Sequence, residues 1–273
     1  AQPATMLILF ILAALANGAA TIADGSRSIE HEREDKGPFR YARLLLAVAA
    51  AMHVFAIGTQ CVQGDHPLKN IYLATSFGTL IAVGGYLALA RRGRGLDALG
   101  SVLAPVGLIG LALGVMFSDV VGATDVVGAG KQLGSAHVGF AAAGLAGFTL
   151  ASGVAGLYLG MERRLRRKQF RPGRGGISLQ GLDQLHHRLV LLVTPVFTLA
   201  IVTGVLWTVD GGGVEQLQGR LFEVAAALVA WLASVSLLVT RALWGTRGRR
   251  SAWLTLVAFA AILLIVISYG VRT

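Results

Sequence analysis

Eight long stretches of the chain contain few or no charged residues, and this feature constrains the fold more than any other. They cover residues 5–23, 43–62, 70–90, 97–117, 136–160, 188–209, 220–241 and 251–270. A bilayer core about 30 Å thick needs roughly 20 apolar residues in each helix that crosses it, and each stretch is about that long. With 55% hydrophobic and 14% charged residues, the sequence predicts an all-α polytopic membrane bundle of eight transmembrane helices, in one membrane domain over residues 1–273. The first stretch has no Lys or Arg ahead of it, unlike a signal peptide, so we expect a retained helix.

The basic residues predict how the bundle lies in the membrane, because Lys and Arg accumulate on the cytoplasmic side. Four loops, 24–43, 91–96, 161–188 and 241–250, hold 20 of the 24 Lys and Arg residues. We therefore expect these loops inside and both termini outside, in the cytoplasmic (inner) membrane of a bacterium. The densest basic segment, 161–176, lies at a helix end, which favours contact with anionic lipid headgroups over contact with nucleic acid.

Two glycine pairs have the spacing of a helix-packing motif. GLALG at 110–114 and GLYLG at 156–160 each place small residues four apart, which lets helix backbones approach closely where lipid provides no hydrophobic drive. We expect close helix packing at both. Asp119 and Asp125, in a repeated DVVGA segment, are expected to lie in a solvated loop rather than in a metal site.

Histidines inside the bundle are candidate functional groups, because lipid offers their polar nitrogens no partner. Helix two enters from the inside at Arg43, so His53, ten residues further on, lies about 15 Å deep, near the bilayer centre. His53 fits either a functional role or a neutral ring bonded to a carbonyl or hydroxyl of a neighbouring helix. We expect His137 to open helix five at the outer interface, and His186 and His187 to be dispensable surface residues.

An imidazole inside a helical bundle suits haem, since it is a common axial ligand and facing helices build cofactor sites. A proton relay needs further titratable groups, and Glu223 is the main one within the apolar stretches. The single cysteine, Cys61, excludes an intrachain disulfide and a paired-cysteine haem attachment. We therefore predict non-covalent haem b, with His53 and His137 as candidate iron ligands. Their expected depths differ by about 10 to 15 Å, so we do not predict that they share one iron.

Several segments resemble one known family. GDHPLKNIY at 64–72 is similar to the G-x-x-P-x-x-N-x-Y element that opens a helix in the cytochrome c assembly family of the CcsA and HemX type. Further segments follow in that family's order: LGSVLAP (99–105), SAHVGF (135–140), LYLGMERRLRRK (157–168), LDQLHHRLVLLVTPVFTLAIVTGVLW (182–207) and GRRSAWLTLVAFAAILLIVISYGV (248–271). The resemblance covers about residues 43–271. It implies a membrane protein that holds haem on a tryptophan-rich outer loop, flanked by histidines, for attachment to apocytochrome c.

The sequence departs from this family at the loop that would hold haem. LWTVDGGGVEQLQGR at 206–220 keeps Trp207 and Asp210 but lacks the string of tryptophans that would give a porphyrin its stacking surface. His137 matches the histidine that this family places before the loop. The second histidine, which the family places after helix eight, is absent here, where the sequence stops at SYGVRT. Leu73 replaces the acidic residue that usually follows the tyrosine of the opening element. The resemblance therefore implies a HemX-like haem-handling protein rather than a haem-attachment enzyme, with His53, His137 and Trp207 as the cofactor-binding residues.

Two other functions remain open at this stage. The chain fits a haem b-containing membrane subunit of a respiratory or photosynthetic electron-transfer complex, and it fits a haem-free scaffold that kept the fold. The expected partners are membrane lipids, haem, and a c-type cytochrome or other subunits of a membrane complex. No catalytic residue is indicated.

Overall fold

The structure, a computed structural model, describes residues 37–62, 66–92, 96–117, 129–168, 178–210 and 220–272. These residues form seven long helices and one short 3-10 helix: α2 (Gly37–Val62), α3 (Ile71–Arg92), η1 (Asp97–Leu99), α4 (Gly100–Met116), α5 (Ala129–Arg166), α6 (Leu179–Asp210), α8 (Leu221–Trp244) and α9 (Arg249–Arg272). All seven long helices, α4 taken together with η1, are long and apolar enough to cross a membrane. The predicted all-α multi-pass membrane fold is therefore confirmed for this part of the chain. The first apolar stretch, 5–23, lies outside the described residues.

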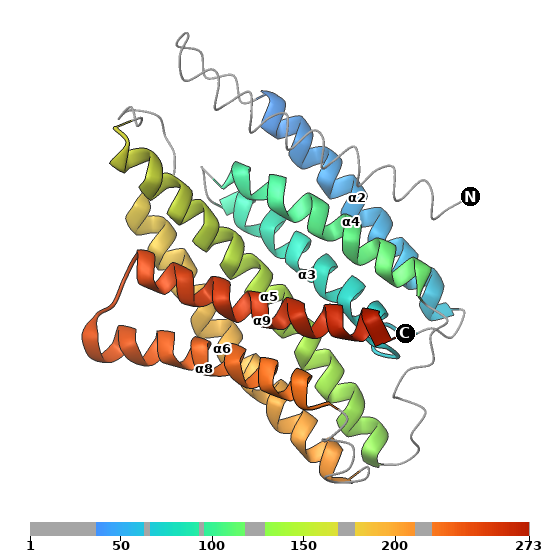
Figure 1. Cartoon of the computed structure of the whole chain (residues 1–273). Coiled ribbons are helices and arrows are strands. Elements are labelled where there is room, and N and C mark those ends of the chain that lie inside the picture. The colour runs from blue at the N-terminus through green and yellow to red at the C-terminus, as the bar shows by residue number, and fades with distance from the viewer. Residues whose placement is uncertain are drawn as a thin grey trace.

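The long helix α5 lies in the middle of the bundle (Figure 1). Helices α2, α3 and α4 lie on one side of it and α6 and α8 on the other, while α9 runs across α5 and ends beside α3. Helix α5 packs against α3, α6 and α9, while α3 packs on α4 and α8 on α9. Helix α5 thus provides most of the contact between the two halves, and α9 adds a smaller contact with α3.

Polar contacts between helix ends define two ends of the bundle. At one end Arg43 of α2 forms an ion pair with Asp97 and donates to the Ala90 carbonyl at 3.1 Å. We call this the basic end, because α2 begins there and because Arg and Lys side chains cluster where α5 ends and α9 begins. At the opposite end the Tyr72 hydroxyl of α3 donates to the Tyr269 carbonyl of α9 at 3.4 Å.

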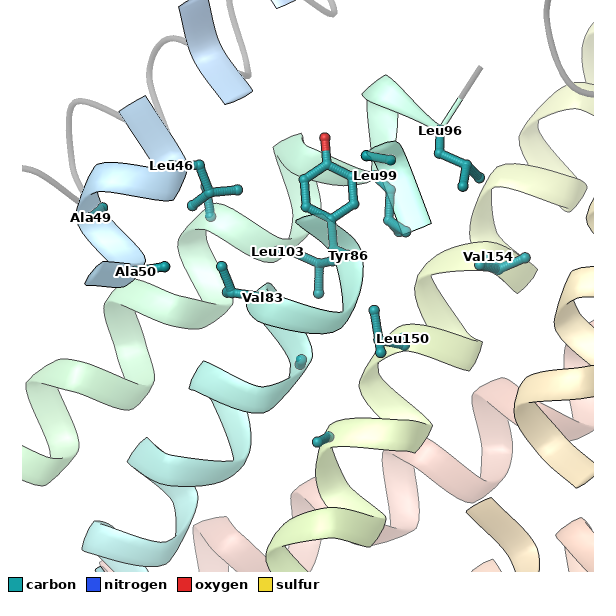
Figure 2. Packing of buried hydrophobic residues seen from close by; sticks show 14 of the residues in the cluster. Leu46, Ala49, Ala50, Val83, Tyr86, Leu96, Leu99, Leu103, Leu150 and Val154 are labelled. Carbon is teal, nitrogen blue, oxygen red and sulfur yellow. The ribbon is translucent and has the colours of Figure 1, made fainter. Parts of the chain in front are cut away.

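Apolar side chains from four helices fill the first half of the bundle. Figure 2 shows Leu46 of α2, Tyr86 of α3, Leu103 of α4 and Leu150 of α5 in one buried cluster. In the second half, the Phe148 ring of α5 packs edge to face on the Phe197 ring of α6, with ring centroids 5.4 Å apart. This packing fixes α5 between its neighbours, so residues on α5 and α6 have well-defined partners.

The two glycine pairs behave differently. A Cβ at Gly114 would lie 2.6 Å from the Ser76 Cβ of α3, and a Cβ at Gly110 would collide with Thr79. The predicted close packing is therefore confirmed for GLALG. It is wrong for GLYLG, because Gly156 and Gly160 are exposed and a Cβ at either position would meet no neighbouring atom of the described residues within 4 Å. Their face of α5 points away from its helix partners.

The GDHPLKNIY element fastens one end of α3. The Asn70 carboxamide oxygen accepts a hydrogen bond from the Leu73 amide at 2.8 Å, and its nitrogen donates to the Phe117 carbonyl at 3.3 Å. The Tyr72 ring stacks on the Phe117 ring with centroids 4.8 Å apart. Asn70 and Tyr72 thus start α3 and tie it to the end of α4, which gives this sequence element a structural role.

Candidate functional site

His137 lies two turns inside α5 rather than at its start. The helix begins at Ala129, so the expectation that His137 opens it is wrong. The apolar stretch begins only at 136 because the preceding residues are small or polar, yet they continue the helix and lengthen it at this end. The imidazole is therefore held between α5 and α6, and it is half-buried.

One hydrogen bond fixes the tautomer of the neutral His137 ring. Its Nδ1 lies 2.7 Å from the Ala200 carbonyl oxygen of α6. A carbonyl only accepts, so Nδ1 must carry the hydrogen, and in the neutral ring Nε2 then carries the lone pair. Histidines that bind metals are commonly held in this way, with one nitrogen donating to a carbonyl and the other facing the metal.

Trp207 lies against His137. The two rings are roughly parallel, with centroids 6.1 Å apart and an interplanar angle of 29°. Trp207 and Asp210 belong to the last turn of α6, which ends at Asp210, so placing them in a loop is wrong. Residues 211–219, the remainder of the expected loop, lie outside the described residues.

Two glycines make room for this ring pair. A Cβ at Gly204 would lie 2.7 Å from the His137 Nδ1, and a Cβ at Gly134 would lie 3.1 Å from the Trp207 Cε2. Each glycine faces the ring carried by the other helix. A half-buried imidazole with a defined lone pair is therefore held against a flat indole, and an imidazole in this state can bind a haem iron.

His53 has a different environment. Its side chain is 0% exposed, and its Nε2 lies 2.8 Å from the Ser76 hydroxyl of α3. This is the arrangement of the second sequence interpretation, a neutral ring bonded to a hydroxyl of a neighbouring helix. An iron at Nε2 would have to displace Ser76. The contacts of His53 with α3 and of His137 with α6 lie on opposite sides of α5, so the structure does not bring the two histidines together (Figure 1).

The sequence analysis missed a buried polar cluster at the basic end. His186 is only 3% exposed, and its Nε2 lies 2.8 Å from the Thr255 hydroxyl of α9. One turn earlier, Asp183 accepts from Arg241 at 2.9 Å and from the Gly248 amide at 3.0 Å. The prediction that His186 is a surface residue is wrong. Helix α6 begins at Leu179, before His186, and the end of α8 and the start of α9 pack against the first turns of α6.

A local signal for this cluster does exist in the sequence. Asp183, His186 and His187 have i, i+3 and i+4 spacing, which places them on one face of a helix. His187 is half-buried rather than fully exposed. Arg241 ends a stretch of α8 that carries no other charge after Glu223, and it is the cation that a buried carboxylate requires.

The described residues hold no group of three or more His, Cys, Asp or Glu side chains that could bind a metal ion. A haem iron, by contrast, requires only one or two protein ligands. Comparison with known protein families matches the chain to the model of the cytochrome C assembly protein, over residues 68–273. No curated protein and no solved structure matches the chain.

Proposed function

Since the chain belongs to the cytochrome c assembly protein family, we propose that this membrane protein handles haem b at His137 and Trp207. Its relation to cytochrome c biogenesis follows from the family and its seven candidate membrane-spanning helices. The observation that carries the proposal is the hydrogen bond from His137 Nδ1 to the Ala200 carbonyl. It leaves Nε2 as the nitrogen that would bind iron.

The donor set fits haem chemically. His137 would supply one nitrogen ligand to the iron, and Trp207 packs against the ring that carries this nitrogen. When bound, haem supplies an iron that takes axial nitrogen ligands and can change its oxidation state. The protein residues orient the ring, since the Ala200 carbonyl sets the tautomer and Gly204 permits the close approach of the two helices.

We propose a role in haem handling rather than haem attachment. Within the segment where this family places its tryptophan-rich loop, Trp207 is the only tryptophan. One indole offers a much smaller stacking surface than a row of them. This favours a HemX-like assembly factor that holds haem b near the outer leaflet, with a c-type cytochrome or another membrane protein as partner.

The proposed orientation places the basic end in the cytoplasm, in a bacterial inner membrane, with eight spans including 5–23. Cys61, exposed at the far end of α2, is a natural reporter of this orientation. A membrane-impermeant maleimide should label Cys61 in intact cells. Arg167→Cys in a Cys61→Ser background should react only after the membrane is permeabilised. The opposite pattern would reverse the orientation.

A haem-free scaffold is the second candidate, and a specific observation favours it. His53 and His186 each bond to a hydroxyl of a neighbouring helix, at 2.8 Å in both cases. Buried structural histidines are satisfied in this way without a cofactor. For His53 this interpretation is the one we adopt.

The visible absorption spectrum of the purified protein tests these alternatives. A Soret band with a reduced spectrum typical of haem b supports haem handling, whereas its absence after expression with ample haem supports the scaffold. A redox titration, together with a search for co-purifying subunits, then distinguishes an assembly factor from a subunit of an electron-transfer complex. Reversible one-electron chemistry in a stable complex with other redox proteins would favour the subunit.

A further inference from the structure

Three buried polar atoms around the Asp183–Arg241 pair have no hydrogen-bond partner among the described residues. They are Nη1 of Arg241, Nδ1 of His187 and Oγ of Ser251. A buried polar group without a partner costs about 1 to 3 kcal/mol. Three such atoms beside one ion pair indicate that a polar group from outside the described residues belongs there.

Several contacts bring these side chains together from three helices. Asp183 of α6 bonds to Arg241 of α8 and to the amide of Gly248, just before α9. His187 lies one turn after Asp183 on α6 and within electrostatic range of Asp183 and Arg241. Ser251 lies in the first turn of α9, three residues after Gly248, and is 3% exposed.

The unpartnered hydrogen-bond donors of the cluster favour an anion. Both Asp183 oxygens already accept hydrogen bonds, from Arg241 and Gly248. Guanidinium Nη1 and the Ser251 hydroxyl can both donate, and a His187 ring with hydrogen on Nδ1 donates as well. A planar guanidinium that holds a carboxylate with one nitrogen can hold an oxyanion with the other.

The position of the cluster gives the anion a route of entry. It lies at the basic end, where Arg249 and Arg250 begin α9, and these arginines are exposed. The side chains of Arg241 and Asp183 are 12% and 11% exposed, so the ion pair lies close to the surface, and the three unpartnered atoms are buried beneath it. Trp244 and Trp253, exposed by 70% and 53%, lie near it in sequence. Tryptophan and arginine at a helix end are typical of the membrane interface, where phosphate headgroups are concentrated.

We propose that Arg241, Ser251 and His187 bind a phosphate group at the basic end of the bundle. The group comes from an anionic lipid headgroup or from free phosphate. This site is separate from His137 and Trp207, and it does not depend on whether the protein binds haem. It is a lipid or anion site on α6, α8 and α9 that also holds these three helices together.

Two substitutions test the site without breaking the ion pair. Ser251→Ala removes a hydroxyl that has no described partner, so the variant should be as stable as the unmodified protein, or more stable, in detergent without added lipid or phosphate. Arg241→Lys keeps a positive charge for Asp183 but removes the second guanidinium nitrogen. Arg164→Gln removes an exposed charge on α5 at the same end and is the matched control.

The probes are phosphatidylglycerol in mixed micelles and, separately, inorganic phosphate, each read out by the thermal unfolding midpoint and by native mass spectrometry. We expect one of them to bind, with affinity about tenfold weaker in Ser251→Ala and Arg241→Lys and little changed in Arg164→Gln. Binding of phosphatidylglycerol alone identifies a lipid headgroup, and binding of inorganic phosphate alone identifies a free anion. If neither binds, or if all three variants respond like the unmodified protein, the proposal is wrong.

Discussion

His137 and His53 both lie within apolar helices, and each has a hydrogen-bond partner on a neighbouring helix. The partner of His137 is the Ala200 carbonyl, which can only accept and therefore fixes one tautomer. The partner of His53 is the Ser76 hydroxyl, which can donate or accept and fixes none. His137 is half-buried beside Trp207, whereas His53 is fully enclosed. Depth in the membrane therefore does not distinguish the two histidines, whereas the chemistry of the hydrogen-bond partner does.

Replacing each histidine in turn provides the strongest test of this difference. His137→Ala should lower the haem content of the purified protein at least about tenfold, because it removes the proposed iron ligand. His53→Ala should leave the haem content nearly unchanged while lowering stability. The measurement is haem per protein by pyridine haemochrome, alongside the Soret position. If His53→Ala loses haem and His137→Ala retains it, the roles assigned to the two histidines are reversed.

Gly204→Ala should produce the next largest effect, because it acts on the support of His137 rather than on the ligand. The new Cβ would lie 2.7 Å from His137 Nδ1, which forces the ring away from the Ala200 carbonyl. Loss of such a supporting contact costs about 10- to 100-fold in metal affinity. Titration of the apoprotein with haem measures this loss of affinity.

Gly156→Ala is the matched control on α5, since the added Cβ would meet no neighbouring atom of the described residues within 4 Å. An Ala in an open helical position should retain haem affinity and gain a few tenths to about 1 kcal/mol of stability. Equal haem loss in both glycine variants would show that the effect is general to these helices and not due to the His137 ring.

The contrast between the two histidines also shows what sequence can predict. The apolar stretches predicted seven helices correctly, because the bilayer sets a minimum length for each. Helix ends were predicted less well, since polar residues at 129–135 and 179–187 continue their helices. The hydrogen-bond and ion-pair partners of the site residues could not be predicted from the sequence. Asp183 and Arg241 lie 58 residues apart, and no local pattern shows that Ala200, rather than another carbonyl, faces His137.

Trp207→Leu should have a smaller effect than either change at His137. An aromatic contact contributes about 0.5 to 1.5 kcal/mol beyond its buried area, so haem should bind about two- to tenfold more weakly with the axial ligand intact. The Soret band should keep its position while its titration midpoint shifts. Trp253→Leu, at a tryptophan that is 53% exposed on α9, is the control and should leave the midpoint unchanged. An equal shift in both variants would remove Trp207 from the site.

Ser76→Ala should have the smallest effect on haem, and it separates the two histidines most cleanly. The substitution removes the hydroxyl that holds His53 Nε2 at 2.8 Å and leaves a polar nitrogen in a fully enclosed position. This should cost about 1 to 3 kcal/mol of stability, seen as a lower thermal midpoint in detergent, while haem content stays constant. Ser101→Ala, whose hydroxyl bonds to the Ala98 carbonyl of its own turn, should lower the midpoint less. If Ser76→Ala instead raises the haem content or shifts the Soret band, His53 Nε2 binds iron once the Ser76 hydroxyl is removed. His53 would then be a haem ligand and not a structural histidine.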